Sequence, residues 1–341
     1  MRRITSLLAL LAVSASPALA RPAASPEQTT APLGADLERF AYPFPVHWYE
    51  TESQGMPVRM AYLDVAPTGP AKNRTVVLLH GKNFCSATWQ DTITALAAQG
   101  YRVIAPDQIG FCKSSKPAGY QYSVAALATL TRGLLDRVGA HKVLLVGHST
   151  GGVIALRFAL LYPKSIDRLV LVNPLGLNDT LAQGVPYTEL GALRAEEAKT
   201  DAASIKAYQL RNYYHGEWRP AYDRWVAMLA GQYAGPDGDR VRDAQARLSD
   251  MLETQPVAAE LDRVSTPVSL LIGQRDRTAF RANSAPESVR GLVQTVPQAA
   301  EAAVHRFREA RLVRIPDAGH APQVEDPEAF AALLLTELAR P

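Results

Sequence analysis

The chain has 341 residues, of which 47% are hydrophobic and 20% are charged, and its formal net charge is +3 at pH 7. This composition is that of a globular protein, and the length is sufficient for one large domain with an inserted piece. A charge this small gives no reason to expect nucleic acid or an anionic surface as a partner.

The first 20 residues have the order of a secretory signal peptide. Arg2 and Arg3 precede an apolar run over residues 7–13, and small residues follow up to Ala20. The apolar run is far shorter than the ~20 residues that a membrane span requires. We therefore expect cleavage after Ala20 and a periplasmic or secreted protein. Residues 21–35 contain too few apolar side chains to fold by themselves and are predicted to be a flexible leader.

Short apolar runs rich in β-branched residues alternate with helical patterns along the rest of the chain. The predicted strands are residues 58–65, 74–80, 101–107, 142–148, 168–173, 267–273 and 310–316. The central runs are apolar throughout, as strands buried on both faces should be. Amphipathic segments such as residues 88–100 lie between them. This alternation predicts an α/β fold, with a mostly parallel sheet flanked by helices.

One interval, residues 178–261, contains no convincing strand and reads as a series of helices. An ordinary crossover between parallel strands needs only about a dozen residues. The simplest interpretation is a helical cap inserted into the sheet domain, whose two parts would be residues 36–177 and 262–341.

The stretch "VLLVGHSTGG" places Ser149 between Gly147 and Gly151, where a strand gives way to a helix. This is the G-x-S-x-G nucleophile elbow, in which a sharp turn lifts the serine hydroxyl to the end of the sheet. The preceding strand and the following helix are the context that supports the motif. Ser149 is the predicted nucleophile.

A serine needs a base to take its proton, and His320 is the best placed of the histidines. It follows the last predicted strand, so it can reach the carboxyl end of the sheet. His148 adjoins Ser149 and is expected to point away from it into packing, while His80 belongs to a separate motif. The other histidines carry no catalytic signature and are expected to be surface or core residues: His47, His141, His215 and His305.

The acid that orients the histidine should follow a strand between the serine and the histidine in chain order. Asp276, in "LLIGQRD", meets this condition. Asp317 is too near His320 in sequence to fold back comfortably onto the imidazole. Asn173 also ends a strand, but an amide cannot stabilise an imidazolium by charge. We therefore assign the acid to Asp276.

Five motifs in chain order resemble those of the α/β-hydrolase fold superfamily, in its serine esterase and iminopeptidase-like branch. They are "LLHGKNF", "VIAPDQIGFCKSS", "VGHSTGG", "LIGQRD" and "AGHAPQVEDPEAF", and the resemblance covers the chain from about residue 45 onward. It implies an eight-stranded sheet, a lid over its carboxyl edge and a triad of Ser149, Asp276 and His320.

The resemblance also implies two backbone donors for an oxyanion. One would be the N–H of Lys82, with Asn83 in reserve, and the other that of Thr150, which opens a helix whose free N–H groups favour negative charge. One departure from the family pattern is Cys112, where relatives often have glycine; it leaves the shape of that loop open. Cys85 and Cys112 follow strands that are neighbours in this fold, so they could form a disulfide or remain buried thiols.

The leading hypothesis is an exported serine hydrolase that cleaves a small-molecule carboxylic ester through an acyl-enzyme, without a cofactor or metal. An aminopeptidase or amidase is the alternative, and it would use cap carboxylates to hold a substrate ammonium. Glu196, Glu197 and Glu217 are available for that role. A ligand-binding protein that has lost turnover is a third reading, disfavoured by the intact triad.

Aromatic residues of the cap could line an apolar acyl pocket, although half or more of them are expected to form the core of the cap. These aromatic residues are Tyr213, Tyr214, Trp218, Tyr222 and Trp225.

Overall fold

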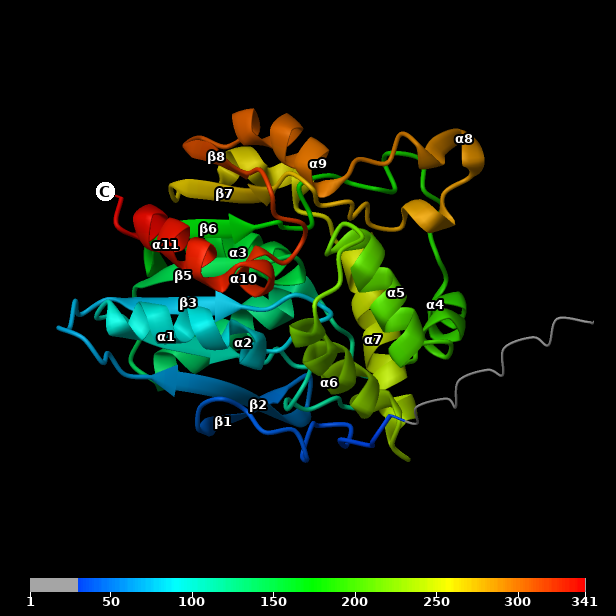
Figure 1. Cartoon of the computed structure of the whole chain (residues 1–341), viewed down its shortest axis with the longest axis horizontal. Helices are drawn as coiled ribbons and strands as arrows, with labels where there is room; N and C mark the ends of the chain where they lie inside the picture. The colour runs from blue at the N-terminus through cyan, green and yellow to red at the C-terminus, as the bar shows by residue number, and fades with distance from the viewer. Residues whose placement is uncertain (1–29, 341) are drawn as a thin grey trace, which may run out of the picture.

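One eight-stranded sheet organises residues 30–340, the part of the chain that this computed structural model describes (Figure 1). The predicted signal peptide and residues 21–29 of the predicted leader lie outside the described residues. The spatial order of the strands is β1-β2-β4-β3-β5-β6-β7-β8. Their bounds are β1 Val46–Ser53, β2 Met56–Val65, β3 Thr75–Leu79, β4 Arg102–Pro106, β5 Val143–His148, β6 Ile166–Val172, β7 Val268–Gly273 and β8 Ala310–Ile315.

The sheet is parallel from β4 to β8, and β2 pairs antiparallel with both β1 and β4. The α/β fold and the seven strands expected from the sequence are confirmed, each within two residues of its predicted ends. Strand β1 was not expected, because its residues "VHWYETES" are largely exposed at the sheet edge. A tight hairpin joins it to β2 through Gln54 and Gly55, whose φ angles of 55° and 70° suit a type I′ turn.

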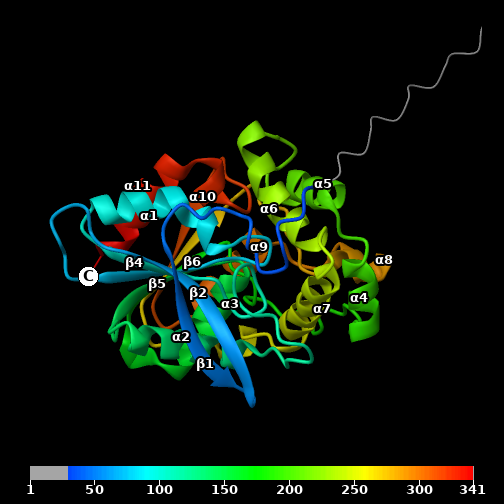
Figure 2. The same ribbon diagram turned by 90° about the horizontal axis from the view of Figure 1, so that it is seen from below.

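Helices cover both faces of the sheet (Figure 2). Helices α1 and α11 pack on the face that carries Val76 and Leu78, whereas α2, α3 and α9 pack on the face that carries Val77 and Leu79. The side chains of β3 therefore alternate between two apolar cores, as the pleat of a central strand requires. The helix bounds are α1 Gln90–Ala98, α2 Val124–Arg137, α3 Thr150–Leu161, α8 Glu287–Arg290, α9 Val296–Ala303, α10 Pro322–Glu325 and α11 Pro327–Leu338.

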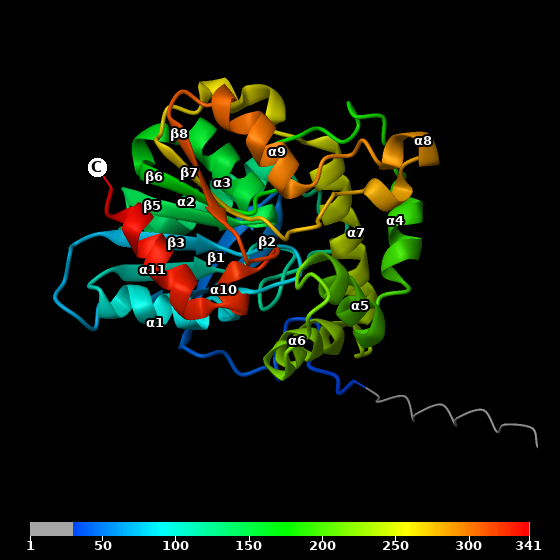
Figure 3. The same ribbon diagram turned by 45° about the horizontal axis from the view of Figure 1, so that its top comes forward.

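Four helices lie between β6 and β7 in the chain and stand beyond the carboxyl ends of the strands (Figure 3). We call them the cap. They are α4 Leu190–Glu197, α5 Ala202–Asn212, α6 Asp223–Tyr233 and α7 Gly238–Thr254. The segment after β7 also reaches this side, where Ala285 and Val293 pack with Val185. No helix within residues 30–340 is long and apolar enough to cross a membrane.

The described N-terminal segment packs against the cap. The N–H of Leu33 donates to the carbonyl of Gly231 in α6 over 2.8 Å, and Ala35 and Leu37 are buried. Asp36 forms ion pairs with Lys116 and with Arg240 of α7. The flexible leader expected over residues 21–35 therefore extends too far at its C-terminal end, because the side chain of Leu33 joins the apolar core.

Candidate active site

Ser149 lies at the sharp turn between β5 and α3. Its φ of 52° and ψ of −117° fall in a region that residues other than glycine rarely adopt. The flanking glycines are required by close backbone packing: a Cβ at Gly147 would lie 2.5 Å from the carbonyl oxygen of Gly151, and one at Gly151 would lie 2.3 Å from that of Leu79. The elbow predicted from the sequence is therefore formed, and its hydroxyl-bearing residue lines a cavity under the cap.

His320 and Asp276 form a buried pair beside this elbow. Nδ1 of His320 lies 2.7 Å from Oδ2 of Asp276, and the second carboxylate oxygen accepts the N–H of Thr278 over 2.8 Å. The imidazole ring is 5.0 Å from that of His148, the residue before Ser149. Because Nδ1–H donates to the carboxylate, Nε2 is left as the proton acceptor, and this buried atom has no hydrogen-bond partner among residues 30–340. Asp317 lies between β8 and His320 and is exposed to solvent.

Two side chains that we had not placed in the site hold the histidine loop, residues 316–321. Nδ2 of Asn173 donates to the carbonyls of Gly319 and His320 over 2.8 and 3.0 Å, and its Oδ1 accepts the N–H of Gly273 over 2.8 Å. Nε2 of His148 lies 2.8 Å from the same carbonyl of His320. Asn173 thus joins β7, which leads to Asp276, to the loop that carries His320.

Glu325 holds the other side of this loop. Its carboxylate accepts the N–H groups of Gly319 and Ala321, the residues on either side of His320, over 2.9 to 3.1 Å. The side chain is buried, and this burial raises the pKa of Glu325 to about 7 against the opposing effect of the two N–H donors. The sequence offered no signal for this role beyond the position of Glu325 five residues after His320.

The predicted oxyanion loop, residues 80–84 after β3, passes directly beside the nucleophile. A Cβ at Gly81 would lie 2.9 Å from the Cβ of Ser149. Lys82, Asn83 and Thr150 all line the cavity that contains Ser149. The backbone N–H groups of Lys82 and Asn83 have no acceptor among residues 30–340, so they are free to donate to a bound group.

The cavity around Ser149 has a volume of about 440 Å³ and a mixed lining. Nζ of Lys82 contacts Oε1 of Glu197 over 2.6 Å and Oγ of Ser249 over 2.7 Å. Glu196 pairs with Arg281 over 2.7 Å. The acidic and basic side chains that line the cavity therefore neutralise one another, and they share the lining with apolar residues such as Leu175, Leu229 and Phe280.

Of the five cap aromatics, Tyr213 alone lines this cavity. Tyr214 and Tyr222 stack on one another with ring centroids 3.8 Å apart, and Trp218 packs edge-on against both. Trp225 is buried in the apolar core. The expectation that half or more of these residues form the core of the cap is confirmed. Two tyrosines outside that prediction, Tyr208 and Tyr233, line the cavity instead.

Cys85 and Cys112 form a disulfide, which decides the alternative that the sequence left open. Cys112 has a φ of 51°, so it adopts the left-handed conformation that a glycine would supply at this turn. The departure from the family pattern therefore does not exclude a glycine-type turn at this residue.

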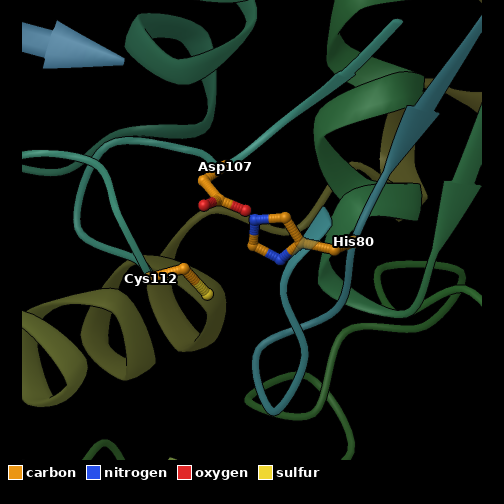
Figure 4. Close-up of side chains that lie close together, drawn as sticks. All are labelled: His80, Asp107 and Cys112. Carbon is orange, nitrogen blue, oxygen red and sulfur yellow. The ribbon is translucent and has the colours of Figure 1, made fainter. Parts of the chain in front are cut away.

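His80, at the start of the oxyanion loop, lies close to Asp107 and Cys112 (Figure 4). The carboxylate of Asp107 already accepts the hydroxyl of Tyr42 and the N–H groups of Ser86 and Lys113. Nε2 of His80 accepts the N–H of Gln108 over 3.1 Å, and burial lowers the pKa of His80. Because the sulfur is in a disulfide and the other donor atoms are occupied, this cluster fits a structural role rather than a metal site.

Comparison with known proteins shows the family to which the chain belongs. Residues 76–333 match the alpha/beta hydrolase family, and the chain belongs to it. The crystal structure of a probable hydrolytic enzyme from Pseudomonas aeruginosa has a TM-score of 0.89 and 48% identity, covering 92% of this chain and 100% of that one.

Sequence relatives agree with this assignment. A putative carbamate hydrolase from Stutzerimonas stutzeri is 31% identical over 78% of this chain and 91% of its own length. An uncharacterized protein of Mycobacterium tuberculosis is 42% identical over 113 residues, and this match spans 31% of that protein's length. The family assignment therefore rests on the match over residues 76–333 and on this carbamate-hydrolase relative.

Proposed function

We propose that the chain is a serine hydrolase that cleaves a small carboxylic ester through an acyl-enzyme. Ser149 is the nucleophile, His320 the general base and Asp276 the acid that orients it. The observation that carries this proposal is the buried pair of His320 and Asp276, which leaves Nε2 of the imidazole unpartnered beside the serine elbow.

The chemistry follows from this arrangement. Oγ of Ser149 attacks the ester carbonyl while Nε2 of His320 takes its proton, and the same imidazolium then returns that proton to the leaving alkoxide. The N–H groups of Thr150 and Lys82, with Asn83 in reserve, donate to the oxyanion of the tetrahedral intermediate, each with an effect of ~10²–10³ on rate. Water activated by His320 then releases the acid from Ser149.

The lining of the cavity favours a neutral substrate over the ammonium-bearing substrate of an aminopeptidase. Glu196 and Glu197 are paired with Arg281 and Lys82, and Glu217 lies outside the cavity, paired with Arg275. No member of this trio of carboxylates is left to hold an ammonium group. The volume of about 440 Å³ suits a small molecule, and the paired side chains and hydroxyls suit one that carries hydrogen-bonding groups.

We also propose that the enzyme is exported to the periplasm or secreted. The signal-peptide pattern up to Ala20 supports this, as does the Cys85–Cys112 disulfide, because disulfides persist in oxidising compartments and are rare in the cytosol.

Replacement of the nucleophile tests the proposed chemistry. Ser149→Ala should abolish both the hydrolysis of a neutral aryl ester and labelling by a fluorophosphonate, while the protein remains folded. Ser165→Ala, in the 3-10 turn that follows α3, is the matched control and should retain both activities. Labelling that survives in Ser149→Ala would mean that another residue is the nucleophile. A panel of aryl esters of increasing acyl length, assayed beside amino-acid anilides, separates the esterase from the aminopeptidase.

A further inference from the structure

Tyr213 follows helix α5 and lies against the proposed base. Its ring centroid is 4.4 Å from that of His320, and the two planes are inclined by 30°. The side chain is almost completely buried, and Tyr208 packs edge-on against it. One face of the His320 imidazole is thus covered by a residue of the cap.

The backbone at Tyr213 forms hydrogen bonds with the loop that carries His320 and with the loop that carries Asp276. The carbonyl of Tyr213 accepts the N–H of His320 over 2.9 Å, and the carbonyl of Asn212 accepts the N–H of Arg277, which follows Asp276, over 3.3 Å. The approach to the histidine loop is close enough that a Cβ at Gly319 would lie 1.8 Å from the oxygen of Tyr213. This packing explains why glycine precedes His320.

The hydroxyl of Tyr213 reaches a third loop. It accepts a hydrogen bond from Nδ2 of Asn83, in the oxyanion loop, over 2.8 Å. Burial raises the pKa of Tyr213 well above its ordinary value, so the hydroxyl stays neutral across the working range of a hydrolase. Asn83 is therefore oriented by a neutral partner that is itself fixed against His320.

We infer that Tyr213 is a positioning residue that fixes the oxyanion loop and His320 relative to one another. This rests on the proposed function, because their relative position matters only if Ser149 reacts with the aid of both. The ring and carbonyl of Tyr213 orient the base, and its hydroxyl orients the loop that supplies the Lys82 N–H. A donor that is misplaced by a fraction of an ångström loses much of its effect on the transition state.

Tyr213→Phe isolates the hydroxyl, because it keeps the ring on His320. We expect kcat for a neutral aryl ester and the rate constant of fluorophosphonate labelling to fall about tenfold, with KM changed less than twofold. Asn83→Ala cuts the same bond from the other side, so it should have a similar effect, and the double variant should be no slower than the slower single variant. Tyr214→Phe is the matched control, since its hydroxyl is buried without a partner among residues 30–340, and it should retain the wild-type rate.

Three results would overturn the inference: wild-type kcat in Tyr213→Phe, full additivity of the two losses in the double variant, or an equal loss in Tyr214→Phe. If Tyr213→Phe does not fold, Asn83→Ala still decides, because wild-type kcat in that variant shows that the bond positions nothing. The proposed function fails separately, through residual activity in Ser149→Ala. An inactive Ser149→Ala beside a fully active Tyr213→Phe would remove the role of Tyr213 alone.

Discussion

The carboxylate of Asp276 accepts a hydrogen bond from Nδ1 of His320 over 2.7 Å, and neither side chain is exposed to solvent. Asp276→Asn should lower kcat by about 10⁴, because an amide would favour the wrong tautomer of the imidazole. Asp317→Asn is the control, and its kcat should stay within about threefold of wild type. Steady-state hydrolysis of an aryl ester checks both values. If Asp317→Asn had the larger effect, the acid would have been assigned wrongly.

The buried carboxyl of Glu325 should make stability depend on pH. Its pKa is raised from 4.5 to about 7 in the folded protein, so between these values the folded state holds a proton that the unfolded chain releases. The free energy of unfolding should therefore fall as pH rises through this window, by about 3 kcal/mol in total. Glu325→Gln lacks this ionisation, so the difference between wild type and variant should change by that amount between pH 4 and pH 8.

Urea unfolding of both proteins at several pH values measures the effect. Parallel pH dependences in wild type and Glu325→Gln would show that the carboxyl titrates alike in the folded and unfolded states.

The disulfide between Cys85 and Cys112 closes a loop with a sequence separation of 27 residues. The loss of chain entropy in the unfolded state predicts that it stabilises the fold by about 3.5 kcal/mol. Wild type in a strong reductant should therefore unfold at a lower denaturant concentration. The double variant Cys85→Ser and Cys112→Ser should unfold near the reduced wild type and should not respond to reductant. Equal unfolding midpoints with and without reductant in wild type would exclude this contribution.

The ion pair between Lys82 and Glu197 should exclude anionic substrates from the cavity, because the ammonium is already neutralised. Glu197→Gln leaves the charge of Lys82 unpaired in a mostly buried site. The ratio of kcat/KM for a monoanionic aryl hemiester to that for a neutral aryl ester of equal length should rise about tenfold. Glu217→Gln, outside the cavity, is the control and should leave the ratio unchanged. An unchanged ratio in Glu197→Gln would remove this pair from substrate selection.

The parts of the site that could be predicted from the sequence are those with strong local signals. Ser149 has a strand before it, a helix after it and glycines on either side. Asp276 follows the buried strand β7, and His320 follows β8, the last strand of the chain. Parallel strands bring such positions to one edge of the sheet, so sequence order alone indicated their proximity. The structure brings His320 and Asp276 together as expected.

The parts that could not be predicted depend on contacts between distant segments. Lys82 meets Glu197 across 115 positions and Asn173 meets Gly319 across 146, and neither pairing has a local pattern. Strand β1 was missed because an exposed edge strand lacks the apolar run that revealed the others. The aromatic residues of the cap gave no indication of which would face the cavity, because most of them lie between α5 and α6, where no helical period marks a face.

Asp36 forms ion pairs with Lys116, on the sheet side, and with Arg240 of the cap helix α7. The N-terminal segment of the described chain therefore bridges the sheet and the cap. The described chain begins beside the cap, whereas helix α11 ends at the opposite side of the molecule (Figure 1). A support or fusion partner attached through Arg340 therefore stays clear of the cap and of the Asp36 bridge. The same attachment at residue 30 would load the ion pairs of Asp36. The measured activity of the immobilised enzyme would then depend on the attachment as well as on the active site.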